Sequence, residues 1–383
     1  MRDDHRRLRI LQVLEPSGGG SGRHFIDLCA GLAARGHRVT AVYSPLRAEP
    51  RFVAELQALR LEAVHSVAMR RAPHPTDLSA LFAIRRIVRK GGPFDIIHGH
   101  SSKAGYLIRL PMPGLPHIPR IYTPHAFRTM DPTLGLAGKA VFGTVEALLG
   151  RAMSDKIICV SKDEHRHALR ALHLPESRLA TVVNGVATPP GDRRDALRRQ
   201  LGFAADNFVF GFIGRLSLQK APERLVSAFA AIAAGFPSAR LLMIGFGELE
   251  AATRGQINDL GMSGKIVLTS DITGPEAIQA MDALVMPSRY EAMAYAMLEA
   301  AAAAKPMVLT EVGGASTVVE DGANGRLVKN SDETSPLAAA MNEFADPVRA
   351  RRYAECAATR ADRYSLDVMI DQTMNVYRNV ILR

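Results

Sequence analysis

Short apolar runs alternate along the chain with longer amphipathic segments. The first run, Leu8–Leu14, leads through a Gly-rich stretch to Gly22–Ala34, whose pattern predicts a helix that ends at Gly36. Further strands are expected near Arg38–Tyr43, Asp95–His98, Arg120–Thr123, Lys156–Val160 and Thr181–Val183, with helices between them. Strands that alternate with helices predict a parallel sheet covered by helices.

A second alternation follows a break at residues 186–191, where two prolines and a glycine stop any regular element. Its strands are expected near Phe208–Ile213, Arg240–Ile244, Lys265–Leu268, Ala283–Met286, Pro306–Leu309 and Gly325–Val328, with a last helix at Ser365–Ile381. The pattern therefore predicts an α/β protein with two doubly wound parallel-sheet domains, residues 1–186 and 187–364. Ligands of such sheets bind at the carboxyl ends of the strands. Five candidate positions fall there, at Gly18–Gly22, His125, Gly214, Gly245 and Glu291.

Length and composition fit this organisation. The 383 residues, 47% of them hydrophobic, are enough for two cores. The 3 cysteines lie far apart without metal-ligand spacing, which fits a reducing compartment. No apolar run reaches the ~18 residues of a membrane span, and the start of the chain lacks a signal-peptide core. We expect a cytoplasmic protein, soluble or bound peripherally to the inner face of the cytoplasmic membrane.

Charge is distributed unevenly. Residues 1–186 hold 27 of the 48 Lys and Arg but only 15 of the 38 Asp and Glu, together with all 12 histidines. A basic N-terminal half predicts an anionic partner. No nucleic-acid-binding signature is present, so an anionic membrane surface with a lipid-linked acceptor is favoured over nucleic acid. An Arg-rich composition without a functional patch is the alternative.

One helix is a candidate for the membrane contact. Asp77–Lys90 carries basic residues opposite apolar ones, namely Arg85, Arg86, Arg89 and Lys90 against Leu78, Leu81, Phe82 and Val88. Such a helix can lie on a membrane, but a solvated basic face has the same pattern.

The segment 288–314 contains two glutamates, Glu291 and Glu299, at the junction between an apolar strand and an Ala-rich helix. If that helix begins at Glu291, both carboxylates lie on one side of it. The N-terminus of a helix that follows a strand suits a diphosphate. Arg215 and Lys220 stand at an earlier strand-to-helix junction, where they can hold one diphosphate from two sides.

Together with Tyr122–His125, these residues resemble the retaining family 4 glycosyltransferases of the GT-B fold, of the bacterial surface-polysaccharide type. The resemblance extends over nearly the whole chain. It includes the loop at 17–20, the segment 95–105 before the active-site histidine, and Val183–Val186 as the interdomain crossover. It also implies that residues 365–383 cross back to the N-terminal domain.

The resemblance implies a role for each matching residue. Arg215 and Lys220 hold the diphosphate of a nucleoside-diphosphate sugar, and Glu299 binds the ribose. His125 and Glu291 are the catalytic residues that face the donor sugar. The N–H groups of Met293, Ala294 and Tyr295 meet the distal phosphate, and the acceptor lies near Gly19, Gly20, Ser102 and Lys103.

Four positions depart from the family pattern and affect the donor-sugar pocket. Gln219 stands where the family usually has Glu. Alanines stand at three positions where the family usually has Gly, namely Ala126, Ala292 and Ala294. Alanine keeps the N–H donor but restricts the backbone and adds a methyl group.

The reaction implied is the retaining transfer of a sugar from a UDP- or GDP-sugar to a hydroxyl of a lipid-linked glycan, in surface polysaccharide or lipopolysaccharide synthesis. No metal or other cofactor is expected, because electrostatic stabilisation of the leaving diphosphate needs none. His98 and His100 are expected to face opposite ways and to make a poor metal pair.

Other classes have weaker support. A GT-B epimerase or hydrolase, or a non-catalytic sugar-nucleotide-binding protein, would share the nucleotide site. A dinucleotide-binding dehydrogenase is disfavoured because Arg23 replaces the third glycine and no acidic residue ends the second strand.

Overall fold

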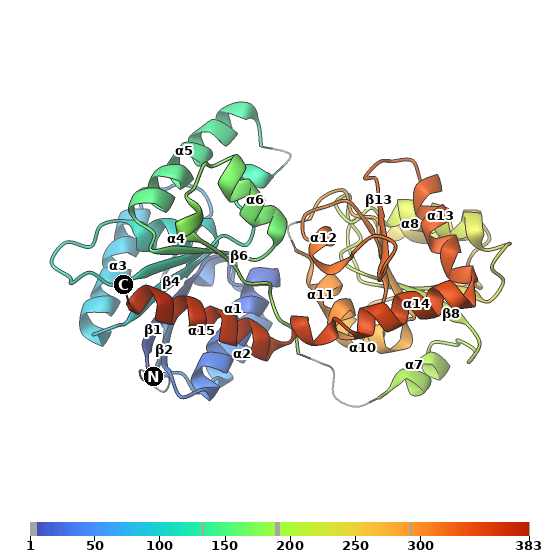
Figure 1. Ribbon diagram of the computed structural model, residues 1–383, viewed down its shortest axis with the longest axis horizontal. Coiled ribbons are helices and arrows are strands. Elements are labelled where there is room, and N and C mark those ends of the chain that lie inside the picture. The colour runs from blue at the N-terminus through green and yellow to red at the C-terminus, as the bar shows by residue number, and fades with distance from the viewer. Residues whose placement is uncertain (1–5, 132–133, 188–191, 292, 383) are drawn as a thin grey trace. The chain divides into compact units, whose positions relative to one another are not determined.

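The computed structural model describes residues 6–131, 134–187, 192–291 and 293–382. The chain divides into two compact units, Met1–Gly185 with Leu366–Arg383 and Val186–Ser365. Each unit is a parallel sheet with helices on both faces (Figure 1). Of the expected break at residues 186–191, residues 188–191 lie outside the described ones.

The first unit is built on a seven-stranded sheet with the order β3-β2-β1-β4-β5-β6-β7. Every neighbouring pair is parallel. The strands are β1 Arg9–Leu14, β2 Arg38–Tyr43, β3 Ala63–Ser66, β4 Ile96–His100, β5 Arg120–Thr123, β6 Lys156–Cys159 and β7 Leu179–Thr181. Its helices are α1 Gly19–Ala34, α2 Pro50–Ala58, α3 Asp77–Gly91, α4 Ser101–Arg109, α5 Leu136–Ala152, α6 Lys162–Arg170 and α15 Leu366–Ile381, with short 3-10 turns at Pro45–Arg47, Arg128–Met130 and Glu176–Arg178.

Side chains of β1 are buried on both faces of this sheet. Ile10 and Leu14 join the core under α1 and α15, whereas Leu11 and Val13 join the core under α3 and α4. Burial on both faces explains the continuous apolar run that marked this strand in the sequence. The last helix, α15, lies beside α1 (red and blue in Figure 1), so the C-terminal segment completes the core of the first unit.

The second unit is built on a six-stranded sheet with the order β10-β9-β8-β11-β12-β13. All its pairs are parallel. The strands are β8 Phe208–Ile213, β9 Ala239–Ile244, β10 Ile266–Thr269, β11 Ala283–Met286, β12 Met307–Thr310 and β13 Gly325–Val328. The helices are α7 Arg194–Gln200, α8 Pro222–Ile232, α9 Glu250–Asp259, α10 Gly274–Ala280, α11 Tyr295–Ala302, α12 Ala315–Val318, α13 Ser335–Asn342 and α14 Pro347–Ala358, with 3-10 turns at Glu343–Ala345 and Ala361–Tyr364.

The two sheets confirm the predicted α/β fold class, with corrections at several boundaries. Helix α1 begins at Gly19, not Gly22, and β7 lies at Leu179–Thr181, before the predicted Thr181–Val183. The edge strand β3 was not predicted, because its residues are only half-buried and show no continuous apolar run. No helix in the described part of the chain has both the length and the apolar character needed to cross a membrane.

Candidate functional site

In each sheet the strand order reverses at one point. Neighbours β1 and β4 mark it in the first unit, and β8 and β11 mark it in the second. The connections that leave such a pair diverge, so the carboxyl ends of the two strands border a crevice that is the usual ligand site of doubly wound folds. Gly19 and His100 flank this point in the first unit, and Lys220 and Glu291 follow the corresponding strands of the second.

Lys220 and Glu291 are brought into direct contact. The Lys220 ammonium lies 2.5 Å from Glu291 Oε1, and the Glu291 side chain is only 7% exposed. Gln219 also connects the loops that carry Lys220 and Glu291, because its side-chain amide donates to the Tyr290 carbonyl oxygen at 3.0 Å. Lys220 is therefore not solvated, because a carboxylate and the surrounding loops cover most of its side chain.

Glycines allow two loops of the second unit to approach each other closely. A Cβ on Gly245 would lie 2.0 Å from the Gly214 carbonyl oxygen, and one on Gly247 would lie 2.4 Å from that of Leu216. Both glycines also have positive φ, 147° and 158°. Only glycine fits at these positions. The backbone of the loop after β9 therefore packs directly against the loop that carries Arg215.

Arg215 differs from Lys220 in its surroundings. It is exposed, and no carboxylate among the described residues pairs with it. Its guanidinium is therefore available to an anion at the carboxyl end of β8.

The helix after β11 begins later than predicted. Helix α11 starts at Tyr295, with Ala294 in an extended conformation as its N-cap. Glu291 therefore lies in the preceding loop, and the expectation that Glu291 and Glu299 share one helix face is wrong. An Ala-rich sequence does not mark where its helix starts, because alanine favours helix without supplying a cap.

The remaining residues proposed for the donor lie on or next to α11. Met293 and Tyr295 are half-buried and Ala294 is buried. Glu299 lies beside the start of α10, where a Cβ on Gly274 would be 3.5 Å from Glu299 Oε2. Ala292, one of the departures from the family pattern, lies outside the described residues.

In the first unit, a carboxylate already occupies the N-terminus of α1. The Gly19 N–H donates to Glu49 Oε1 at 3.1 Å, while Gly20 is exposed on the first turn. A Cβ on Gly18 would lie 2.5 Å from the Glu49 carboxyl carbon. The Gly-rich loop thus lets Glu49 reach an orphan N–H group.

His125 and Ala126 both adopt left-handed backbone conformations, with φ of 54° and 85°. This conformation explains why glycine is the usual residue after the histidine. The Ala126 N–H donates to Glu164 Oε1 at 2.7 Å, and the Val160 N–H donates to Glu164 Oε2 at 2.6 Å. Burial raises the pKa of Glu164 to about 7, while these two N–H groups oppose the shift. Glu164 therefore positions the loop of His125, a role that the sequence did not reveal.

Four histidines gather beside this loop. The ring centroids of His98 and His100 lie 4.0 Å apart, and the ring centroids of His24 and His125 lie 4.7 Å apart. We expected His98 and His100 to face opposite ways, and this is wrong, because residues two apart on a strand share a face. Burial lowers the pKa of all four, that of His24 to about 4.

The two residues proposed for the acceptor lie at the start of α4. Ser102 is half-buried. Lys103 is buried, with its ammonium 2.5 Å from Asp77 and 3.0 Å from the Ala72 carbonyl oxygen. The structure thus gives Lys103 a partner that an anionic acceptor would have to displace.

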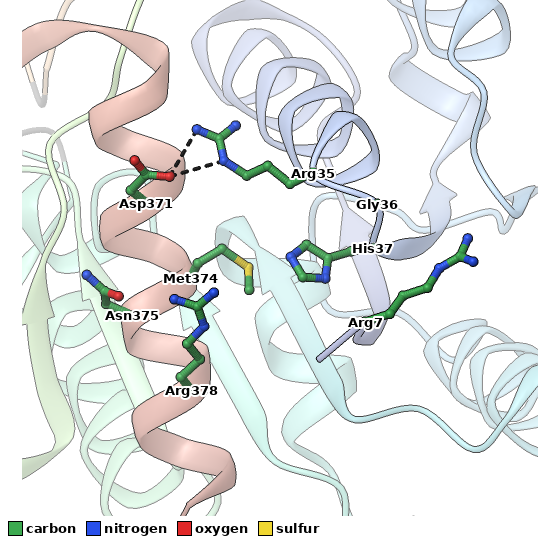
Figure 2. Close-up of a pocket in the computed structure, with 8 residues that line it drawn as sticks. All are labelled: Arg7, Arg35, Gly36, His37, Asp371, Met374, Asn375 and Arg378. Atoms are coloured by element: carbon green, nitrogen blue, oxygen red, sulfur yellow. Dashed lines mark hydrogen bonds and ion pairs between the residues drawn. The ribbon is translucent and has the colours of Figure 1, made fainter. Parts of the chain in front are cut away.

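A basic pocket of about 610 Å³ lies between α15 and the turn after α1 (Figure 2). Arg35 points toward Asp371 on α15, whereas Arg7 extends on the far side of His37. The basic side chains that line this pocket do not point toward a common centre. The pocket also lies away from the carboxyl ends of the strands.

Comparison with known families identifies the class of the protein. Residues 18–188 match the model of glycosyltransferase family 4, and residues 193–359 match that of glycosyl transferases group 1. The chain belongs to the family 4 glycosyltransferases and is a glycosyltransferase of the GT-B fold.

Individual relatives share this class. The chain is 24% identical to an Escherichia coli UDP-Gal:alpha-D-GlcNAc-diphosphoundecaprenol alpha-1,3-galactosyltransferase, over 80% of each chain. It is 29% identical to a D-inositol 3-phosphate glycosyltransferase of Stackebrandtia nassauensis, over 76% of this chain and 70% of that one. Anabaena HepE, solved with UDP and glucose, shares the fold with a TM-score of 0.78 and 21% identity over 97% of this chain and 100% of that one.

Proposed function

We propose that the protein transfers a sugar, with retention of configuration, from a UDP- or GDP-sugar to a hydroxyl of a lipid-linked glycan in surface polysaccharide or lipopolysaccharide synthesis. The observation that carries this proposal is the meeting of Lys220 and Glu291 at the strand-order reversal of the second sheet. The E. coli relative, named for a diphosphoundecaprenol acceptor, supports the lipid-linked acceptor.

The donor diphosphate binds between Arg215 and the start of α11. Arg215 offers an exposed guanidinium, which suits bidentate binding of phosphate oxygens. The Lys220 ammonium has three N–H donors, so it can keep Glu291 and also donate to the diphosphate. The N–H groups of Met293, Ala294 and Tyr295 add to this positive end, and Glu299 accepts from the ribose.

Departure of the diphosphate is the step that these groups assist. Negative charge builds on the leaving oxygen as the sugar becomes oxocarbenium-like, and fixed positive groups stabilise that charge. No metal is needed for this role. Glu291 and His125 orient the donor sugar, and the leaving phosphate accepts the proton of the attacking hydroxyl on the same face.

The acceptor binds to the first unit near Gly19, Gly20, Ser102 and Lys103. Helix α3 supports contact with an anionic membrane, because one exposed face carries both apolar and basic side chains. Leu78 and Phe82 are 64% and 60% exposed, and Arg86, Arg89 and Lys90 are exposed further along the helix. Leu78 and Phe82 were expected opposite the basic face, and this is wrong, because Ala80, Ile84 and Val88 form the buried face instead.

Mass spectrometry of nucleotide sugars released from the purified protein tests the proposal. We expect a UDP- or GDP-sugar, and nucleoside diphosphate release that depends on an added undecaprenyl-diphosphate-linked saccharide. Rapid release without any acceptor would favour an epimerase or hydrolase. If neither nucleotide sugar binds or turns over, the proposal is wrong.

A further inference from the structure

Three histidines of the first unit come together from separate elements. His24 lies on α1, His100 ends β4, and His125 follows β5. One ring nitrogen from each lies within 4.8 Å of those of the other two. His24 and His100 are buried, and His125 is half-buried, so an ion would enter from the side of His125.

The hydrogen bonds of His100 leave its Nδ1 unprotonated, and the lone pair of this nitrogen faces the cluster. The Gln12 amide donates to the Tyr377 hydroxyl at 2.9 Å, so its oxygen accepts from His100 Nε2 at 2.7 Å. His100 Nδ1 is then unprotonated and lies 3.2 Å from His125 Nε2. Two imidazole ligands of a tetrahedral zinc ion, each at ~2.0–2.1 Å from the metal, stand about 3.3 Å apart. This pair therefore has the separation that zinc requires.

His24 is the third member of the cluster. Neither of its ring nitrogens makes a hydrogen bond of ordinary geometry with the described residues, although the ring is buried. The Asn184 side chain lies close enough to interact weakly with this ring. A buried imidazole without a well-formed hydrogen bond costs free energy that a metal–ligand bond would recover.

The fourth histidine is excluded from the set by its own hydrogen bonds. His98 contacts the Tyr377 hydroxyl at 2.7 Å and the Thr123 hydroxyl at 2.8 Å, one with each ring nitrogen. This network holds Gln12 and hence the orientation of His100, as residues behind metal-bound histidines commonly do.

We propose that His24, His100 and His125 bind one Zn²⁺ ion, with a fourth position left to water or substrate. Three imidazoles with an open position form a known zinc arrangement. On binding, His125 Nε2 becomes a ligand and its proton moves to Nδ1 or to solvent. The inference rests on the proposed function in one respect, because the bound ion withdraws His125 from the donor sugar. Zn²⁺ is therefore an inhibitor here and not a cofactor.

Zinc titration of the tag-free protein against a chromogenic chelator tests the site. His24→Leu is the informative variant, because leucine is similar in size, suits a buried position and has no metal-binding atom, and only the weak contact with Asn184 is lost. We expect one equivalent of Zn²⁺ to bind to the wild type, with affinity at least 10-fold lower in His24→Leu. The control His117→Ala changes a histidine that is 75% exposed and outside the cluster, and should bind like the wild type. Equal affinity in His24→Leu, or no stoichiometric binding to the wild type, overturns the proposal.

Transferase activity with and without Zn²⁺ separates this site from the proposed function. Each protein is compared with itself, so any effect of His24→Leu on basal activity cancels. Inhibition of the wild type that is relieved in His24→Leu supports both assignments. Binding of Zn²⁺ without inhibition supports the metal site but contradicts the role of His125 at the donor sugar.

Discussion

At the scale of single residues, the contact between Lys220 and Glu291 links the stability of the second unit to its proposed donor site. The Lys220 side chain is 16% exposed and that of Glu291 is 7% exposed. Lys220→Ala should therefore abolish transfer and also lower the free energy of unfolding by about 1–3 kcal/mol, because a nearly buried carboxylate loses its charged partner. Urea unfolding of the purified variant measures this loss.

Two further variants distinguish the loss of the Lys220–Glu291 ion pair from a general effect of removing a lysine. The double variant Lys220→Ala/Glu291→Gln should recover part of the lost stability, since the amide needs no counter-charge, but not the activity. Lys329→Ala removes an exposed lysine of the same unit and should change neither the free energy of unfolding nor the transfer activity. Wild-type stability in Lys220→Ala would show that the pair contributes nothing to the fold.

The backbone conformation of Ala126 leads to a second prediction for a single residue. Its φ of 85° disfavours any residue with a Cβ. Ala126→Gly should therefore raise the free energy of unfolding by about 1 kcal/mol. Ala140→Gly, at an exposed position within α5, should lower it by a similar amount. A loss of stability in both variants would contradict the strain assigned to the His125 loop.

At the scale of elements, α1, β4 and the loop after β5 bring four histidines together. Burial lowers the pKa of His24, His98, His100 and His125. As the pH falls below ~6.5, the unfolded chain gains protons that the folded protein does not, which favours unfolding. Glu164 acts in the opposite direction, because its pKa of about 7 lets the folded state take up a proton first.

The balance of these groups gives a measurable pH dependence. On unfolding, the four histidines take up protons and the glutamate releases one, a net uptake of about three protons, so the contribution of these five groups to stability should fall by up to about 4 kcal/mol per pH unit between pH 7 and 5.5. His24→Leu removes one titrating group and should reduce this slope by about 1.4 kcal/mol per pH unit. Urea unfolding across this range provides the measurement, and an unchanged slope in His24→Leu would count against a neutral His24.

Helix α3 gives the second prediction at the scale of elements. If its exposed face meets an anionic membrane, Arg86→Glu/Arg89→Glu should reduce binding to vesicles rich in acidic lipid by at least 10-fold at low salt, at ~1 kcal/mol per charge. Binding of the wild type should weaken as ionic strength rises. Arg199→Glu/Arg351→Glu makes the same charge change at exposed positions of the second unit. Equal losses in the two variants would indicate only a general effect of net charge.

Elements were predictable from the sequence where burial was continuous. Strands β1, β8 and β11 are buried on both faces and read as apolar runs, whereas β3 is half-buried and gave no signal. The start of α11 was missed because Ala294 caps it without a side-chain hydrogen bond. His24 could not be linked to His100 and His125 from sequence alone, because only the fold brings α1 next to the ends of β4 and β5.

At the scale of the whole molecule, membership of family 4 rests on both halves of the chain. The two family models together match residues 18–188 and 193–359. The chemistry depends on few positions within that length, and the unusual alanine at 126 is one of them. Among these positions, those of the proposed diphosphate site lead to the most direct prediction.

Calorimetric titration of UDP and of GDP, carried out in EDTA, tests the central claim most directly. Arg215 is exposed and unpaired among the described residues, so Arg215→Ala should leave stability unchanged and remove one charge-assisted phosphate contact. We predict that one of the two nucleotides binds without metal, and that Arg215→Ala weakens it at least 30-fold, equivalent to ~2 kcal/mol. Lys329→Ala should bind like the wild type. Undiminished affinity in Arg215→Ala, or binding only after Mg²⁺ is added, would contradict the account.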